Sequence, residues 1–363
     1  MAPFVPVVSA GPSAPPTVGK GLRHWLGRVL SIVTGVYAVA LVVLLVALEW
    51  WGERNVLLSL LLFAPPHALL APLIGLIPAA LILRPRLCLW HLACVAVVAF
   101  GYMTFRWHER PSQAAKPLVV ITHNVGQGNR AQFLAFLSAE KPDVILLQDA
   151  RNRGAEYAKL FPDFYVAGSG EFYLIARDLV QQSMLLDEPK WKGRPVAARY
   201  EIIRNGHPLV LYNVHIPTPR SQFDRFLSRR VVADLFGDEE HGAAFGSYRE
   251  WIDARVELAR NLARVFAAEK EPFIACGDFN TPDHGAIYHL FADEMSDAFA
   301  HSGRGWGLTF PGETRNPLAL FGAWLRIDYA FAGRGWKPLY CEPEPGRKSQ
   351  HHAVVARFAP LAP

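Results

Sequence analysis

The sequence has few cysteines, and none is placed to form a cysteine-based site. Only four of its 363 residues are Cys: Cys88, Cys94, Cys276 and Cys341. The first two lie in a hydrophobic run, and no two have the spacing of a zinc site or belong to a disulfide framework. The cysteines therefore give no support to a zinc-binding or disulfide-stapled domain, and they leave the compartment open.

Charged residues are almost missing from the first third of the chain. Between Val29 and Phe105 there are two acidic residues, Glu49 and Glu53, and three basic ones. Val29 to Leu48 is a run of twenty uncharged residues, which is long enough to cross the ~30 Å hydrocarbon core of a bilayer. Because it is longer than the apolar part of a signal peptide and no small-residue cleavage site follows, we interpret it as an uncleaved anchor.

Two more apolar stretches follow this anchor. The one from Val56 to Leu83 is interrupted by four prolines, so we expect a short interfacial piece up to Phe63 and a kinked span from about Pro66. A third span is expected from Leu87 to Phe105. The predicted organisation is a disordered, basic N-terminus (1–28), a three-span membrane region (29–105), a linker (106–116) and a soluble domain (117–363).

Lys and Arg are distributed unevenly around the predicted spans. Three precede the first span, one lies in the next loop and two lie in the loop between the second and third spans. The positive-inside rule then puts the N-terminus in the cytoplasm and, after three spans, the soluble domain on the periplasmic or extracellular side of the inner membrane. Three basic residues between 106 and 116 act against this orientation.

The soluble part lacks the basic excess that is typical of proteins that bind nucleic acid. Residues 1–105 carry six of the 37 Lys and Arg and two of the 32 Asp and Glu, so 31 basic and 30 acidic residues remain. A protein that binds nucleic acid through its phosphates usually carries a basic excess on the binding domain. Nucleic acid is therefore a disfavoured partner.

From Pro117 onward, short β runs alternate with helical segments. An Asn-Gly pair between Arg204 and His207 is typical of a hairpin turn, and Ser247 opens a capping box for a helix to about Lys270. Another helix is expected at 129–140, and strands at 117–125, 143–150, 171–177, 195–203, 208–216, 272–280, 325–332 and 353–358. Hairpins with interleaved helices predict an α/β sandwich with mixed sheets.

Polar side chains stand at the ends of six of these strands: Asn124, Asp149, His215, Asp278 with Asn280, Asp328, and His351. Each alone also fits a turn, a helix cap or a surface loop, but together they are typical of a site at the edge of a sheet. Asp and Asn oxygens suit Mg²⁺ or Mn²⁺, and two histidines beside a carboxylate suit the attack of water on a phosphate ester.

The motifs THNVG, LLQD, NVHIP, GDFNTP, RIDYAF and SQHHAVVA follow one another in this order. In that order the chain resembles the endonuclease/exonuclease/phosphatase superfamily over about residues 117–359, and its N-terminal spans resemble membrane-anchored bacterial members. The resemblance implies a four-layer α/β sandwich of the DNase I-like type, with a metal-dependent phosphoesterase site at one edge. The substrate would be a phosphodiester or phosphomonoester, such as a lipid head group or another membrane-proximal ester.

The resemblance also implies a role for each residue. Asn124, Asp149 and Gln350 would hold Mg²⁺ or Mn²⁺, and Asp278 would orient or deprotonate the attacking water. Asn280 would position the phosphate and His215 would donate to its oxygens. Asp328 would orient His351, the general acid/base, and His352 falls outside the pattern.

Two departures from the family pattern keep other functions open. Asp149 stands where the family usually has Glu, and Gln350 stands where a carboxylate is expected. A degenerate relative that binds without cutting is therefore one alternative, and an extracytoplasmic nuclease is another. The segment 219–237 interleaves Phe with Arg, which suits either a lid or an ordinary amphipathic helix.

Overall fold

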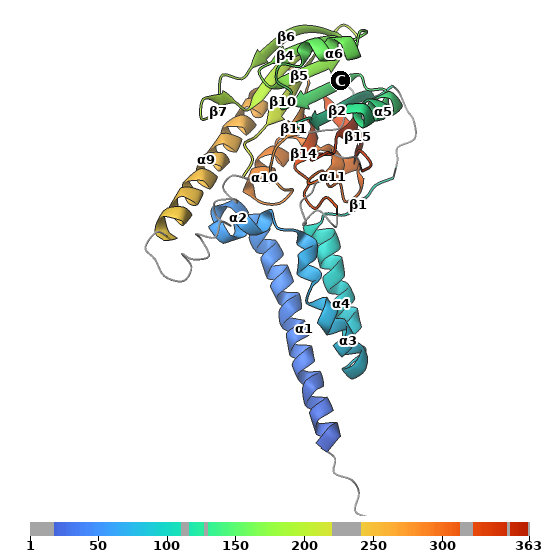
Figure 1. Ribbon diagram of the computed structural model, residues 1–363, viewed down its shortest axis with the longest axis vertical. Helices are drawn as coiled ribbons and strands as arrows, with labels where there is room; N and C mark the ends of the chain where they lie inside the picture. The colour runs from blue at the N-terminus through green and yellow to red at the C-terminus, as the bar shows by residue number, and fades with distance from the viewer. Residues whose placement is uncertain are drawn as a thin grey trace, which may run out of the picture.

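The computed structural model describes residues 18–109, 116–126, 130–219, 241–312, 322–346 and 349–361. Two parts are evident in it: a bundle of apolar helices at the N-terminal end, here called the stalk (residues 18–102), and an α/β domain (Figure 1).

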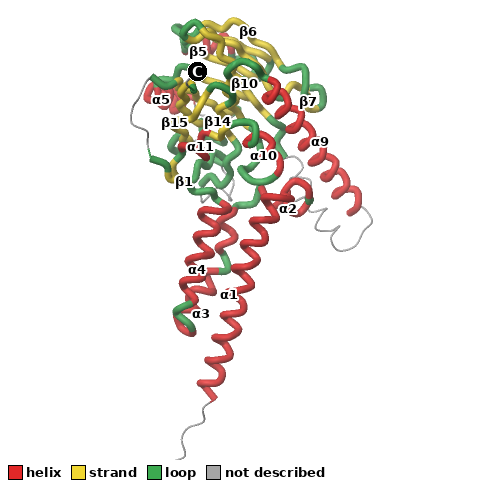
Figure 2. Tube along the Cα trace, turned by 180° about the vertical axis from the view of Figure 1, so that it is seen from behind, coloured by secondary structure: helices red, strands yellow, loops and turns green. Residues whose placement is uncertain are grey.

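The stalk contains three apolar helices that run side by side away from the α/β domain (Figures 1 and 2). They are α1 (Val18–Trp51), α3 (Leu73–Leu83) and α4 (Leu87–Ala96), and α4 continues into a π-helical turn, η3 (Val97–Tyr102). Large apolar side chains face outward along α1, where Ile32 is 65% exposed. By length and composition, the stretches Gly21–Arg54 and Pro66–Leu83 could each cross a membrane.

Two of the three predicted spans coincide with helical stretches that are long and apolar enough to cross a membrane. The third apolar helix covers Leu87–Tyr102, and its 16 residues would be about 24 Å long, short of the ~30 Å hydrocarbon core. Between α1 and the second stretch, η1 (Gly52–Arg54) leads into α2 (Val56–Leu62), capped by the side chain of Asn55. The second stretch is divided into η2 (Pro66–Leu70) and α3, which contains Pro78. The predicted short piece before a kinked helix is thus present.

The α/β domain is built on two six-stranded sheets. The first has the order β15-β16-β2-β3-β5-β4, and the second has the order β12-β14-β11-β10-β9-β6. The first sheet contains β2 (Leu118–Asn124), β3 (Val144–Gln148), β4 (Tyr165–Ser169), β5 (Phe172–Ala176), β15 (Trp336–Pro343) and β16 (Val354–Pro360). The second contains β6 (Leu179–Leu185), β9 (Ala197–Arg204), β10 (His207–His215), β11 (Phe273–Asp278), β12 (Ser296–Asp297) and β14 (Asp328–Ala332).

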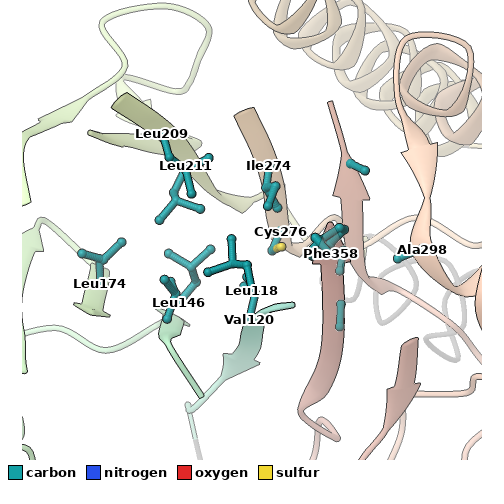
Figure 3. Packing of buried hydrophobic residues seen from close by; sticks show 14 of the residues in the cluster. Leu118, Val120, Leu146, Leu174, Leu209, Leu211, Ile274, Cys276, Ala298 and Phe358 are labelled. Carbon is teal, nitrogen blue, oxygen red and sulfur yellow. The ribbon is translucent and has the colours of Figure 1, made fainter. Parts of the chain in front are cut away.

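Three apolar cores separate four layers. Side chains such as Leu146, Leu211 and Ile274 fill the space between the two sheets (Figure 3). The outer face of the first sheet is covered by α5 (Arg130–Glu140) and α6 (Gly154–Leu160), and that of the second by α9 (His241–Ala268) and α10 (Ala286–Ala292). A short helix, α11 (Ala298–Ser302), packs against β14 and β15. The predicted four-layer α/β sandwich is confirmed.

Several local predictions can be compared directly. Each predicted strand has a counterpart, and Asn205 and Gly206 have the positive φ angles, 52° and 81°, of the predicted hairpin turn. The helix predicted to begin at Ser247 begins at His241, so the capping box lies inside α9 and that prediction is wrong. Short strands join Arg106–Trp107 to Arg304–Gly305 and Lys190–Trp191 to Arg194–Pro195. Residues 220–237, most of the predicted lid, lie outside the described residues.

Strand direction brings the predicted site residues to one edge of the sandwich. β2 is parallel to β3 and β10 is parallel to β11, so their carboxyl ends lie at the same edge of each sheet. β14 is antiparallel to β11, and β16 is antiparallel to β2, so both of these strands begin at that edge. Polar residues at the end of one strand and the start of the next are therefore neighbours.

Candidate active site

Asp278 lies at the centre of the polar cluster. It ends β11, and it is only 1% exposed. Its Oδ2 accepts a hydrogen bond from Asn124 Nδ2 at 2.9 Å and lies 3.8 Å from Nε2 of both His215 and His351. Burial raises the pKa of the Asp278 carboxyl and the nearby Asp328 raises it further, while the two imidazoles lower it; the net shift is upward.

The glycine before Asp278 is required by the approach of two strands. Gly277 has φ +149°, and a Cβ on it would lie 2.0 Å from the carbonyl oxygen of Val214. In this close parallel pairing His215 stands opposite Asp278, which places an imidazole beside the carboxylate.

His351 is oriented by a second carboxylate. Its Nδ1 donates to Asp328 Oδ2 at 3.0 Å, which leaves Nε2 directed at Asp278. Asp328 stands opposite Asp278 in the β11–β14 pairing, and its amide donates to Thr309 Oγ1 at 3.2 Å. Burial lowers the pKa of the His351 imidazole, but Asp328 and Asp278 outweigh it and raise the pKa to about 9.

His215 has a carboxylate partner that the sequence did not identify. Its Nδ1 donates to Glu171 Oε1 at 2.9 Å, and Glu171 also accepts from Arg151 at 2.7 Å. Burial raises the pKa of Glu171, but hydrogen bonds and charge from His215 and Arg151 lower it to about 2. Glu171 precedes β5, whose antiparallel pairing with β3 brings it to the edge where Asp149 lies. In the sequence, Glu171 is only a polar residue at the start of a predicted strand. Its place in the site follows from the pairing of β5 with β3.

One pocket of about 420 Å³ gathers the predicted residues. Seven of the eight predicted site residues line this pocket. The exception is Asp328, which contacts His351 and does not reach the pocket itself. The pocket is also lined by residues outside the predicted set, among them Gly126, Arg151, Glu171, Trp191, Arg194, Phe310 and Ser349. The Phe310 ring packs on the imidazole of His351, with ring centroids 4.9 Å apart.

The donors at one side of this pocket fit a hard metal ion. Asn124 Oδ1 and Asp149 Oδ2 lie 3.4 Å and 2.6 Å from the point that a Cβ of residue 126 would occupy, so both oxygens face the same space. Gly126 leaves that space open, and Gln350 lines the same pocket. Asp149 itself has a left-handed backbone, φ +52°, as a residue that turns sharply out of β3. Oxygen donors of this kind suit Mg²⁺ or Mn²⁺.

A second group of donors overlaps the first. Asp278, Asp328 and His351 each offer one atom within 4.8 Å of the others, a spacing that could also hold a metal. Because His351 Nδ1 already donates to Asp328, and Asp328 does not line the pocket, we interpret this group as the acid/base pair and its neighbour.

Asn280 follows Asp278 in a left-handed conformation, with φ +48°. Two hydrogen bonds fix its position. Its backbone N–H donates to Asp278 Oδ1, and its side-chain Nδ2 donates to the carbonyl of Ile216, each at 2.9 Å. His352 does not line the pocket, and its backbone N–H donates to the carbonyl of Thr309.

A comparison with family sequence profiles adds an independent observation. Residues 121–351 match the profile described as the Endonuclease/Exonuclease/phosphatase family, a stretch that contains every predicted site residue. The chain belongs to this family. Its members are hydrolases that act on phosphoester bonds and generally use divalent metal ions.

Solved structures with the family's DNase I-like fold resemble the chain. One is a humanized TDP2 from D. rerio, with 17% identity, a TM-score of 0.45, and coverage of 67% of this chain and 99% of that chain. A 3′ phosphatase NExo variant from Neisseria, bound to product DNA hairpin, has 15% identity, a TM-score of 0.43 and the same coverage. The mannosyl-6-phosphatase of Bacteroides thetaiotaomicron has 13% identity and a TM-score of 0.45, again with 67% and 99% covered. No curated protein sequence matches the chain.

Proposed function

We propose that the protein is a membrane-anchored, metal-dependent phosphoesterase that hydrolyses a phosphodiester or phosphomonoester. The observation that carries this proposal is the buried Asp278 between two imidazoles, each 3.8 Å from its carboxylate and each held by a carboxylate of its own. The carboxylate can take a proton from the attacking water. The two imidazoles can donate to the oxygens of a phosphate ester, which gain negative charge in the transition state.

Each residue has a defined task in this hydrolysis. A water held by Asp278 attacks the phosphorus while its proton passes to the Asp278 carboxylate. The bond from phosphorus to the leaving oxygen breaks, and His351 Nε2 donates a proton to that oxygen. His215 donates to the phosphoryl oxygens, Asn280 positions the phosphate, and Asp328 keeps His351 in the required orientation.

The metal-binding residues in this proposal are Asn124, Asp149 and Gln350. When bound, Mg²⁺ or Mn²⁺ would supply a positive charge that neutralises phosphate oxygens. Support comes from the two side-chain oxygens that face the space above Gly126.

The helical stalk is the proposed membrane anchor. Two of its helical stretches have the length and composition to cross a bilayer, and the shorter third one returns the chain to the α/β domain. We propose an inner-membrane protein with its catalytic domain on the periplasmic or extracellular side.

The proposed substrate is a phosphate ester at the membrane surface, such as a lipid head group. Support comes from a pocket of about 210 Å³ at the junction of stalk and domain, with a mostly apolar lining that includes Leu48, Leu69 and Trp324. A nuclease is the second enzymatic possibility, disfavoured by the near-equal numbers of basic and acidic residues beyond the stalk. A non-catalytic binding protein is disfavoured because the histidines and buried carboxylates are all in place.

The test is a panel of phosphodiesters and phosphomonoesters, lipids and oligonucleotides included, assayed on the full-length protein in detergent with Mg²⁺ and with Mn²⁺. We expect metal-dependent release of phosphate or of an alcohol from at least one non-nucleic-acid ester, and none after chelation. Turnover of oligonucleotides alone would replace the proposal with the nuclease. Absence of turnover across the panel at saturating metal would favour the binding protein.

A further inference from the structure

The short turn η1, which follows the first stalk helix, packs against the α/β domain. Glu53, in η1, is only 3% exposed, and its Oε2 accepts a hydrogen bond from the backbone N–H of Ala286 at 2.7 Å. Gly285 lies so close that a Cβ there would be 2.4 Å from the same oxygen. Among the described residues, the other carboxylate oxygen, Oε1, has no hydrogen-bond partner.

A buried arginine of α9 contacts the same segment a few residues earlier. Arg255 is 2% exposed, and its guanidinium donates to the backbone carbonyls of Asn280 and, at 3.4 Å, Phe279. Burial lowers the pKa of Arg255 to about 10, opposed mainly by the negative charge of Glu53, so the group is a cation at neutral pH. Its Nε has no hydrogen-bond partner among the described residues.

These two side chains hold the segment that follows Asp278. Arg255 fixes the carbonyls of residues 279 and 280, and Glu53 fixes the amide of residue 286. Two more contacts reach the same segment: Glu49 of the stalk accepts from His284 at 2.9 Å, and Thr104, just after the stalk, donates to Asp283. The stalk is therefore part of the support beneath the active site.

We propose that Glu53 and Arg255 are positioning residues, through which the end of the membrane anchor fixes the geometry of Asp278 and Asn280. Two buried groups that can carry opposite charges, with incomplete hydrogen bonding, add little to stability, because desolvation offsets any attraction between them. Their specific contacts are with the backbone of the catalytic segment, so their effect is on the position of the reacting groups. The consequence for turnover rests on the proposed function.

The decisive variant is Glu53→Gln/Arg255→Met, compared with both single variants in the full-length protein. The double variant removes both buried ionisable groups together, so we expect its thermal unfolding to stay near wild type. It also removes the donor to the carbonyls of residues 279 and 280, and we expect kcat to fall on the order of 100-fold with KM nearly unchanged, as for a small displacement of reacting groups. Arg255→Lys keeps a cationic donor, so its kcat should lie between those of Arg255→Met and wild type.

Arg260→Met is the matched control, because Arg260 lies on the same helix but faces solvent and pairs with Glu257. It should behave as wild type. The proposal would be overturned if the double variant had the wild-type kcat. It would also be overturned if the loss in kcat were no larger than the loss of folded protein.

Hydrogen–deuterium exchange gives a test without substrate. Peptides covering residues 279–290 should exchange faster in Arg255→Met and in the double variant than in wild type, with the strands of the first sheet unchanged. If exchange there does not change, the positioning role is wrong whatever the activity. If exchange rises as expected while wild type cleaves no ester in the panel, the positioning role stands and the proposed function fails.

Discussion

Asp278 combines burial with two imidazole neighbours, and that combination predicts how the protein responds to substitution. Asp278→Asn changes almost no volume but removes the proton acceptor, so we expect the fold to persist and turnover to fall at least 100- to 1,000-fold. His351→Ala should cause a comparable loss, because it removes the proposed proton donor. The measurement is kcat/KM on the best substrate of the panel, with circular dichroism as the check on folding.

His352→Ala is the matched control for His351→Ala, since the two histidines are adjacent and only His351 lines the pocket. We expect it to retain most activity. Hydrolysis at the wild-type rate by Asp278→Asn would refute the assigned mechanism, and equal losses at positions 351 and 352 would refute the assignment of His351.

Gln350 gives a second prediction at this scale. A glutamine offers a metal ion a neutral oxygen, and Asp149 is one methylene shorter than the glutamate usual in the family. Because hard divalent ions gain affinity from ligand charge, we expect half-maximal activity only at high Mg²⁺. Gln350→Asp should lower that concentration, measured by titrating wild type and variant side by side. A variant that needs more metal than wild type would instead assign Gln350 to substrate.

Seven of the eight residues predicted for the site line one pocket, because they stand in recognisable motifs at strand ends. Asn124, His215, Asp278 and His351 are placed in one pocket by strand order alone. Glu171 was missed because its meaning depends on the pairing of β5 with β3, which no local pattern encodes. Glu53 and Arg255 were missed for a similar reason: their contacts join segments 233 and 25 residues apart in the chain.

At the scale of elements, α9 is joined to the second sheet by a half-buried carboxylate. Glu269, just beyond the helix, accepts from Arg199 Nε at 2.9 Å and from Tyr212 Oη at 2.8 Å, and its side chain is 10% exposed. Burial raises the pKa of Glu269, but these hydrogen bonds and the Arg199 charge lower it overall. A group whose folded pKa is lowered contributes stability above its unfolded pKa of about 4.3, and loses it as the pH falls through the folded value.

Glu269→Gln should therefore destabilise the protein by about 2 kcal/mol at pH 7, the usual size of a hydrogen bond to a charged group. The difference from wild type should shrink as the pH falls below 4, because the wild-type carboxylate is then protonated. Urea unfolding at pH 7, 5 and 3.5 measures this. Glu257→Gln, on the exposed face of the same helix, is the control. A difference that does not depend on pH would mean that shape and not charge accounts for the effect.

Element boundaries show where sequence patterns stop being informative. The Asn-Gly turn and the buried strands were predictable because turn chemistry and apolar runs act locally. The capping box at Ser247 does not mark the start of the helix, because α9 begins six residues earlier, at His241. The third apolar segment, 87–105, has enough residues to cross a bilayer, but its helix ends at Tyr102. Thr104 and Phe105 lie beyond the helix and contact Asp283 and Trp306 of the α/β domain.

For the whole molecule, the distribution of charge along the stalk decides the predicted orientation. At the end far from the α/β domain, Arg23 donates to the carbonyl of Ile82 and Arg84 donates to Ser31, so the N-terminal end of α1 and the α3–α4 loop lie together. The acidic residues of the stalk, Glu49 and Glu53, lie at the domain end instead. The basic end is the one that the positive-inside rule assigns to the cytoplasm.

This arrangement holds whether α4 spans the bilayer fully or only in part, because the chain passes up α1, down α3 and up α4 before it enters the domain (Figure 1). A periplasm-active reporter fused to the C-terminus should therefore be active, and a cytoplasm-active reporter there should be silent. The same two reporters fused to the N-terminus should give the reverse result, which controls for expression and insertion. Activity of only the cytoplasmic reporter at the C-terminus would place the candidate active site inside the cell. In that topology α3 turns back without crossing, and Arg106 and Lys116 are the basic residues retained on the cytoplasmic side next to the domain.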